Sequence, residues 1–370
     1  MHRRNFFQMA AATGIAAAPA MPAPEADAGA DPQVIAMGDG IPHSTRQYSQ
    51  LLAKLEIEAD NYSQNGVVGT LEKKFASLLG KEYAVFLPTG TLANHLAVRM
   101  LAGNRRRVLV QADSHLYNDC GDCAQTLSGL NLAPLSAMTL EAVESEMNRA
   151  ATGRVASPVG ALQIETPVRR RTGQMVDFGE MRKICGYLRE RNVGLHLDGA
   201  RLFIGSAYTG VSANEYAALF DTVYVSLYKY FNAASGAVLA GPKTLLENLF
   251  HTRRMFGGGL HHAWPFAAVA LHYLEDFEQR FRKAVECSEK VIAVLAKDAN
   301  FEIERIPQGT NLFRFRVRGV NAAIYQQRLE SAGVSTRAPE SGEWYTLAVN
   351  ETWNRLPPDQ IVTVFRNALG

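Results

Sequence analysis

One strand–helix–strand unit in the middle of the chain constrains the fold most. Residues 194–198 (Gly-Leu-His-Leu-Asp) have the pattern of a buried strand that ends in a carboxylate, and residues 222–227 (Thr-Val-Tyr-Val-Ser-Leu) that of a second strand, followed by Lys229. A short helical pattern over 213–220 separates them, which is the spacing of parallel strands joined by a crossover helix. Because the carboxyl ends of parallel strands meet at one sheet edge, we expect Asp198 and Lys229 to emerge side by side in a crevice. Two surface loops with ordinary charges are the alternative.

An aspartate and a lysine placed in this way suit pyridoxal phosphate as a cofactor. The lysine forms a Schiff base with the cofactor, and the acid keeps the pyridine nitrogen protonated. A phosphate-binding turn is predicted upstream, where the apolar strand 83–87 leads into Pro88-Thr89-Gly90-Thr91 and a new helix. Backbone amides at a helix start, together with two threonine hydroxyls, form a cradle for phosphate. Helix capping is the alternative role for a threonine at this place.

A single histidine is expected beside the cofactor. His115 follows the predicted strand 108–110 and precedes a helix, so its imidazole can stack on the pyridine ring; capping or packing is the alternative. Cys120 and Cys123 come next, and no second pair at zinc spacing exists, so we expect no metal site. In an oxidising compartment these two cysteines can form a disulfide, and two buried thiols are the alternative.

Composition restricts the classes of partner. The chain has 370 residues, 47% hydrophobic and 20% charged, and is long enough for one large and one small domain. Its net charge of +2 provides no basic face for nucleic acid. The arginine runs at 105–107 and 169–171 fit solvated loops. No apolar run reaches the roughly 18 residues of a membrane span, and we expect a small-molecule substrate.

The first thirty residues have the pattern of an export signal. Residues 2–8 (His-Arg-Arg-Asn-Phe-Phe-Gln) place twin arginines before two aromatics, and a weakly apolar run over 9–18 follows. Small-residue cleavage sites lie at 18–20 and 28–30. This is typical of a twin-arginine signal and predicts a periplasmic or secreted protein, with residues 1–30 as signal and leader. An irregular tail with a chance arginine pair is the alternative.

The remaining pattern predicts two further domains, a large cofactor-binding α/β domain over 31–262 and a small C-terminal α+β domain over 263–370. The large domain has helical patterns at 48–59, 70–80 and 176–191, and strand patterns at 162–166 and 237–241. One or two long helices over 264–295 lead into the small domain. That domain has a strand at 312–317, a helix at 321–332, a strand at 344–349 and a last helix from 358.

Several of these segments together resemble the threonine aldolase branch of the β-eliminating lyase family, which are fold-type I pyridoxal-phosphate enzymes. They occur in the same order and at similar spacing, over about residues 35–350. The matching segments are 86–91 (Phe-Leu-Pro-Thr-Gly-Thr), 114–115 (Ser-His), 195–203 (Leu-His-Leu-Asp-Gly-Ala-Arg-Leu-Phe), 226–229 (Ser-Leu-Tyr-Lys), 236–241 (Gly-Ala-Val-Leu-Ala-Gly) and 255–259 (Met-Phe-Gly-Gly-Gly).

The resemblance implies an α/β fold with a large mixed or parallel sheet and a smaller C-terminal α+β domain. By this resemblance, Lys229 forms the Schiff base, Asp198 contacts the pyridine nitrogen and His115 stacks on the ring. Gly90 and Thr91, with Thr89, hold the phosphate, and Arg201 lies at the cofactor and contacts the substrate carboxylate. A homodimer or homotetramer is implied as well, because sites of this fold form between subunits.

The chain departs from the family on the substrate side. Residues 37–40 (Met-Gly-Asp-Gly) replace Arg-Ser-Asp-Thr, and residues 165–168 (Glu-Thr-Pro-Val) replace Glu-Asn-Thr-His, whose histidine is implicated in aldol cleavage. Residues 343–347 (Glu-Trp-Tyr-Thr-Leu) stand where an arginine before Val-Thr-His clamps the carboxylate. His261 and a second histidine stand where an arginine follows the glycine-rich turn. A carboxylate does not replace an arginine clamp, because it repels the substrate carboxylate.

Two interpretations of these departures stay open. Arg337 takes the role of the clamp, or the substrate is a larger or differently charged amine. The expected activity is cleavage of a β-hydroxy-α-amino acid to glycine, or a related amino acid, and an aldehyde. The alternatives are β-elimination, transfer between aldehydes, and a non-catalytic protein that binds the cofactor.

Overall fold

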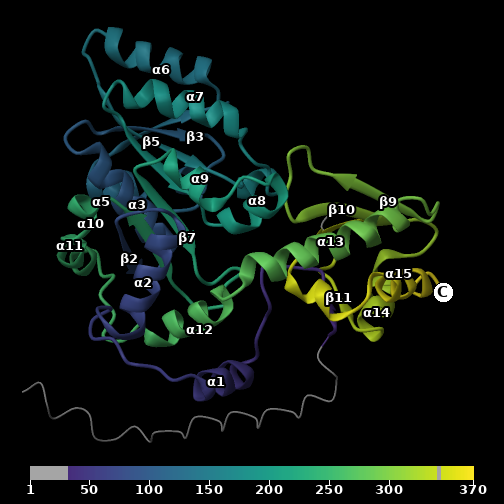
Figure 1. The fold of residues 1–370 in the computed structure, drawn as a ribbon. Coiled ribbons are helices and arrows are strands. Elements are labelled where there is room, and N and C mark those ends of the chain that lie inside the picture. The colour runs from purple at the N-terminus through teal and green to yellow at the C-terminus, as the bar shows by residue number, and fades with distance from the viewer. Residues whose placement is uncertain (1–31, 340–342) are drawn as a thin grey trace, which may run out of the picture. The chain divides into compact units, whose positions relative to one another are not determined.

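A seven-stranded sheet lies at the centre of the fold (Figure 1). The computed structural model describes residues 32–339 and 343–370, so the predicted export signal lies outside the described residues. All neighbouring strands are parallel except at β8, which runs antiparallel to both of its neighbours. The α/β class with a mixed sheet is therefore confirmed. The strand order is β2 (Tyr83–Leu87), β8 (Ala237–Gly241), β7 (Thr222–Ser226), β6 (Gly194–Asp198), β5 (Val159–Glu165), β3 (Arg107–Gln111) and β4 (Asn131–Leu135).

Helices cover both faces of this sheet, and the strands are therefore apolar on both sides. Phe86 and Leu197 point into the larger core cluster on one face, whereas Val85 and Leu239 pack against α3 on the other. The helices of this part are α1 (Thr45–Lys54), α2 (Gly66–Leu78), α3 (Gly90–Ala102), α4 (His115–Asn118), α5 (Cys123–Ser128), α6 (Leu140–Thr152), α7 (Phe178–Arg189), α8 (Leu202–Thr209), α9 (Ala213–Ala218), α10 (Lys243–Leu246) and α11 (Leu249–Met255).

The C-terminal part is a smaller sheet with its own hydrophobic core. Strand β10 (Leu312–Val317) lies between β12 (Trp344–Ala348) and β9 (Phe301–Arg305), and all pairings are antiparallel. Its buried and partly exposed residues alternate, as expected when one face of an antiparallel sheet meets the core. The later turns of α13 (Phe277–Leu295), with α14 (Ala322–Ser331) and α15 (Pro358–Asn367), pack here, whereas α12 (Trp264–Leu274) and the first turns of α13 belong to the core of the large sheet. The division of the chain at residue 262 stays a prediction.

The beginning of the described chain is fixed to this C-terminal part. Strand β1 (Val34–Ile35) pairs in parallel with β11 (Val334–Ser335). The side-chain nitrogen of Asn350 donates to the carbonyl of Ile35 at 2.9 Å. The chain therefore leaves this two-stranded sheet at two neighbouring places, with residues 36–40 after β1 and the residues that follow β11.

The crossover unit predicted from the sequence is confirmed, because β6 and β7 are parallel neighbours with His196 opposite Thr222. Other boundaries differ. The helix predicted at 48–59 occupies 45–54, because a capping box formed by Ser44 and Gln47 starts it earlier. The pattern over 264–295 contains two helices, α12 and α13, and Asp276 between them adopts a positive φ of 52°.

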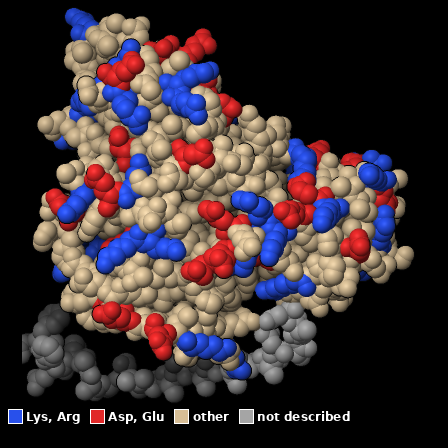
Figure 2. Space-filling view, in the orientation of Figure 1, with Lys and Arg blue, Asp and Glu red and all other residues tan. Residues whose placement is uncertain are grey.

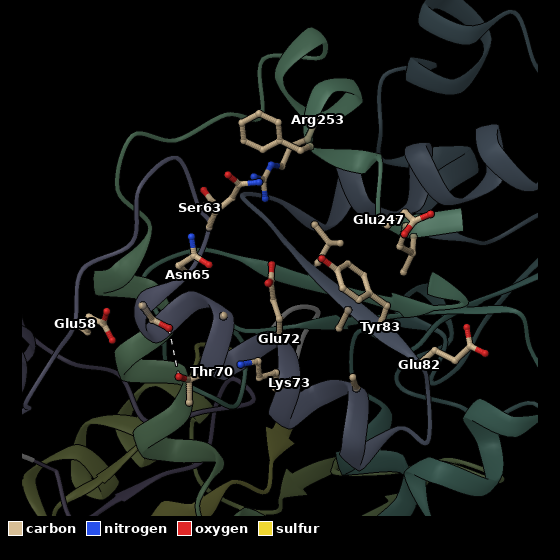
Figure 3. Close-up of a pocket in the computed structure, with 18 residues that line it drawn as sticks. Glu58, Ser63, Asn65, Thr70, Glu72, Lys73, Glu82, Tyr83, Glu247 and Arg253 are labelled. Carbon is tan, nitrogen blue, oxygen red and sulfur yellow. Dashed lines mark hydrogen bonds between the residues drawn. The ribbon is translucent and has the colours of Figure 1, made fainter. Parts of the chain in front are cut away.

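Strand β2 lies at the edge of the large sheet, and two side chains satisfy its open side. The backbone N–H of Phe86 donates to Oε1 of Glu72 at 2.8 Å, and its carbonyl accepts from Nη1 of Arg253 at 2.7 Å. Glu72 and Arg253 point toward one another in a cavity of about 500 Å³ (Figure 3). Burial raises the pKa of Glu72 to about 7, against the hydrogen bond from Phe86 and the charge of Arg253. Glu72 and Arg253 together therefore hold the end of β2, the strand that leads into residues 88–91.

The described surface carries both signs of charge. Acidic and basic side chains are interspersed over the face shown in Figure 2, without a field of one sign. Within residues 32–339 and 343–370, no helix is both long and apolar enough to cross a membrane.

Candidate active site

A cavity of about 730 Å³ lies at the carboxyl ends of the central strands, and the predicted site residues line it. It is lined by residues of three regions: the N-terminal segment, the turns after the large-sheet strands, and the loop after β11. The lining residues are Gly38, Asp39, Pro88, Thr89, Gly90, Thr91, His115, Glu165, Arg169, Asp198, Ala200, Arg201, Tyr224, Tyr228, Lys229, Ala234, Ser235 and Arg337. Every residue predicted for the site from the sequence lies in this wall.

Asp198 and Lys229 meet at this cavity because their strands are parallel neighbours. Asp198 is the last residue of β6 and is 2% exposed. Lys229 follows β7 by three residues, and its Nζ donates to the hydroxyl of Tyr228 at 3.2 Å. Burial and the nearby charge of Arg201 lower the pKa of the Lys229 amine, so a larger fraction of the amine is unprotonated and nucleophilic.

The predicted phosphate turn forms the N-terminus of α3. Thr89 is the N-cap, and its hydroxyl accepts from the N–H of Leu92 at 3.2 Å, so its side chain has the capping role that the sequence left open. Gly90 and Thr91 then present the first backbone amides of the helix, where the helix dipole favours an anion. Gly90 packs against Tyr224, and a Cβ atom at this position would lie 1.9 Å from the tyrosine hydroxyl. Only glycine therefore fits this cradle.

His115 is the first residue of α4 and lines the same cavity. Its backbone N–H donates to Oε2 of Glu165 at 2.5 Å, and its Nδ1 lies 3.3 Å from the Sγ of Cys120. Burial lowers the pKa of the imidazole, although Asp198 raises it, which favours the neutral ring that stacks on a pyridine. Cys120 and Cys123 are both free thiols here.

Arg201 and Asp39 form an ion pair that the sequence did not predict. The Nε of Arg201 donates to Oδ2 of Asp39 at 2.8 Å, and both side chains are largely buried. Asn311 also donates to Asp39, from 3.4 Å. Asp39 thus holds one edge of the guanidinium and leaves the terminal nitrogens of Arg201 for a second carboxylate. The sequence does contain a sign of this role, because Asp39 is an acid in segment 37–40, which differs from the family pattern.

Arg337 lines the cavity, whereas the strand that carries the family's clamp does not. Within the two described ranges, Arg337 has no hydrogen-bond or ion-pair partner and faces both this cavity and an adjoining one of about 650 Å³. Trp344, at the start of β12, instead stacks under Arg314 and Arg316, at 4.6 and 4.9 Å. Of the two interpretations left open by the sequence, the geometry favours Arg337 as the cation for the substrate carboxylate.

Glu165 and Arg169 occupy the region of the missing histidine. Oε1 of Glu165 accepts from the N–H of Arg169 at 2.8 Å, while Oε2 accepts from that of His115. Burial and the neighbouring Asp198 raise the pKa of Glu165 to about 7. The sequence placed an acid at the end of this strand but gave no sign of its two backbone partners, which lie 4 and 50 residues away.

The residues of this cavity fit pyridoxal phosphate. An amine lies beside an acid for the pyridine nitrogen, a helix start provides amides for the phosphate, and Gly90 keeps that start open. In the described part of the chain, no group of three or more His, Cys, Asp or Glu is arranged to hold a metal ion.

Comparisons with known proteins agree with this geometry. The low-specificity L-threonine aldolase of Candida albicans is 30% identical over 222 residues, which span 58% of each chain. The alanine racemase TOXG of Cochliobolus carbonum is 30% identical over 240 residues, 63% of this chain and 61% of the racemase. The match thus spans less than two thirds of either curated relative.

A solved structure and a family description cover more of the chain. The crystal structure of a putative L-allo-threonine aldolase from Listeria monocytogenes superposes with a TM-score of 0.76 at 27% identity, over 91% of this chain and 95% of that one. Residues 37–315 match the family described as beta-eliminating lyases, whose members depend on pyridoxal phosphate. The chain belongs to the beta-eliminating lyase family.

Proposed function

We propose that this protein is a pyridoxal-phosphate-dependent lyase that cleaves a β-hydroxy-α-amino acid to glycine and an aldehyde. The observation that carries the proposal is the convergence of Lys229, Asp198 and the α3 turn on one cavity, with two arginines on its substrate side. The bound cofactor acts as an electron sink for the bond that breaks at the α-carbon. The aldolase relatives and the aldolase structure support this choice of bond.

The cofactor half of the site divides into four tasks. Lys229 would hold the cofactor through its amine, whose lowered pKa makes it a better nucleophile. The Asp198 carboxylate would accept a hydrogen bond from the protonated pyridine nitrogen, and the amides of Gly90 and Thr91 would donate to the phosphate. His115 covers the ring.

The substrate half depends on two arginines. Arg201, oriented by Asp39, and Arg337, which has no partner among the described residues, together bind the α-carboxylate. Bidentate arginine contacts fix the plane of a carboxylate, which in turn sets which bond at the α-carbon faces the electron sink.

A second candidate is racemisation or β-elimination at the same cofactor. Two observations favour it: the family's histidine for aldol cleavage is replaced by Val168, and one relative is an alanine racemase. Both activities need the cofactor half and a carboxylate clamp but no base for a β-hydroxyl proton.

Purified protein with bound cofactor tests the two candidates. Release of glycine and acetaldehyde from at least one of the four threonine stereoisomers is expected, and Lys229→Ala should abolish both this release and the visible absorption of the lysine-bound cofactor. Conversion of L-alanine to D-alanine, or release of ammonia from serine, without any glycine would support the second candidate. An unchanged visible spectrum in Lys229→Ala would refute the cofactor assignment itself.

We also propose export through the twin-arginine pathway and assembly into a homodimer or homotetramer. The twin arginines at positions 3 and 4 support the first, and the intersubunit sites of this fold class support the second. Cell fractionation of the wild type and of Arg3→Lys/Arg4→Lys should show periplasmic protein only for the wild type. Light scattering on the purified protein measures the assembly, and a monomer with full activity would refute it.

A further inference from the structure

Behind Asp198 runs a chain of buried hydrogen bonds that reaches away from the cavity. Oδ2 of Asp198 accepts from Nδ2 of Asn94 at 2.6 Å, and Oδ1 of Asn94 meets Nε2 of His196 at 2.8 Å. The other ring nitrogen, Nδ1, lies 2.9 Å from the hydroxyl of Thr222. Asn94, His196 and Thr222 are each 0% exposed. Four side chains thus form one continuous path from the cavity wall into the sheet.

The fold brings these residues together by simple periodicity. His196 and Asp198 are two residues apart on β6, so their side chains lie on the same face of the sheet. Thr222 stands opposite His196 on the parallel neighbour β7. Asn94 comes from α3, which covers this face and also carries the phosphate turn at its first residues. One helix therefore carries both the phosphate turn and a hydrogen-bond partner of Asp198.

The three hydrogen bonds together define which atom donates and which accepts in each of them. A carboxylate only accepts, so the amide nitrogen of Asn94 faces Asp198 and its carbonyl faces His196. Nε2 of His196 therefore carries the proton, and Nδ1 accepts from the hydroxyl of Thr222. Burial lowers the pKa of His196 to about 3, which keeps the ring neutral and the pattern fixed at working pH. In a cationic ring both nitrogens would donate, and the Thr222 hydroxyl would have to turn to accept.

We propose that His196 and Asn94 are positioning residues that orient the Asp198 carboxylate toward the pyridine nitrogen of the cofactor. Without them, the backbone N–H of Ala200, at 3.1 Å, is the one donor to Asp198 left among the described residues. A carboxylate held by two donors on different oxygens has its plane defined, whereas one donor leaves it free to rotate. The inference rests on the proposed function only for the role of Asp198.

Other titratable groups also face Asp198 and contribute to the spectrum of the bound cofactor. They are Glu165 from β5, Tyr224 from β7, His115 from α4, Cys120 and Lys229. None of them changes in the variants below, so a shift between variants reports on the chain of hydrogen bonds.

The test compares His196→Leu with His196→Gln, because the glutamine amide can place an N–H near the position of Nε2. His95→Leu is the matched control: His95 is a neighbouring residue of Asn94, is 2% exposed and bonds the Ser128 hydroxyl at 2.7 Å, but has no link to Asp198. Three quantities are measured: the cofactor dissociation constant of the apoprotein, the pH midpoint of the visible absorption of the holoprotein, and the thermal midpoint of the apoprotein.

The proposal expects His196→Leu to weaken cofactor binding about tenfold and to move the pH midpoint of the absorption, with His196→Gln close to the wild type. His95→Leu should lower the thermal midpoint only. Equal binding and equal pH midpoints in His196→Leu and His95→Leu would overturn the proposal and leave a purely structural role.

Asn94→Asp keeps the experiment decisive if His196→Leu does not fold. The variant has nearly the same size but places an acceptor against Asp198, and it should weaken cofactor binding at least as much. Wild-type binding by Asn94→Asp would overturn the proposal. None of these readouts depends on turnover, so a lack of lyase turnover would refute the proposed function alone.

Discussion

Oδ2 of Asp39 accepts a hydrogen bond from the Nε of Arg201 at 2.8 Å, although 162 positions separate the two residues. Asp39 belongs to the segment that leaves strand β1, and Arg201 comes directly before helix α8. The pair joins the beginning of the described chain to the carboxyl edge of the large sheet. It orients the first of the two arginines assigned to the substrate.

Asp39→Ala should raise the KM for the amino acid about tenfold, because Arg201 loses the partner that orients its guanidinium. The visible spectrum of the bound cofactor should stay unchanged. Asp39→Asn keeps an oxygen acceptor and should have a smaller effect. Steady-state kinetics with absorption spectra check this, and a lowered kcat at constant KM would contradict the assigned role.

Arg337→Gln should raise the KM by about 10- to 100-fold, since a charge-assisted contact to the substrate carboxylate is lost. Arg318→Gln is the control, because Arg318 pairs with Glu302 on the exposed side of the small sheet and does not line the cavity. A cofactor titration should give the wild-type dissociation constant for both variants. An unchanged KM in Arg337→Gln would restore the interpretation of a differently charged substrate.

Gly90→Ala should weaken cofactor binding by tenfold or more, because the new methyl group overlaps the Tyr224 hydroxyl and displaces the start of α3. Gly69→Ala provides the comparison: this α2 glycine has open space around its would-be Cβ, so alanine there should bind cofactor normally and slightly stabilise the helix. Spectroscopic titration of both apoproteins measures the difference. Equal affinities would show that the turn does not hold the phosphate.

Glu72→Gln should remove a pH dependence of stability. The folded-state pKa of Glu72, raised to about 7 by burial, exceeds its unfolded value, so the folded state binds the extra proton. Wild-type stability from this group is therefore highest at low pH and falls as the pH rises from about 4.5 to about 7. The amide avoids the cost of the buried charge and keeps an oxygen for the N–H of Phe86.

The variant should be more stable than the wild type above pH 7, by on the order of 1–3 kcal/mol, and nearly equal to it near pH 4.5. Denaturant unfolding at both pH values measures this, with the exposed Glu58→Gln on the same cavity wall as control. A constant difference at both pH values would contradict the assignment.

The cofactor half of the site could be predicted because its residues stand at the ends of strands with clear apolar patterns. Asp198, Lys229 and Gly90 each follow such a strand, and the rule that parallel strands share a carboxyl edge brings them together. The residues next to each of them in the sequence were sufficient to predict their place in the site. The family resemblance added roles to positions that the pattern had already grouped.

The remaining site residues depend on contacts that no local pattern encodes. Asn94 and His196 look like ordinary polar residues of a helix and a strand, and only the packing of α3 on the sheet joins them. Asp39 follows β1, a two-residue strand too short to show a periodicity, and its partner Arg201 is 162 positions away. Strand β4 was missed for a related reason, because Pro134 within it argues against a strand and is tolerated only at the sheet edge.

The pairing of β1 with β11 has a consequence for the order in which the site is completed during synthesis. The residues from β2 to β8 contain all seven strands of the large sheet and can fold before the C-terminal part is made. Asp39, although made earlier, has no fixed place until residues 334 and 335 emerge and pair with β1. Arg337 follows two residues after β11. The residues assigned to the cofactor are therefore made, and can be ordered, before the residues of the substrate side are complete.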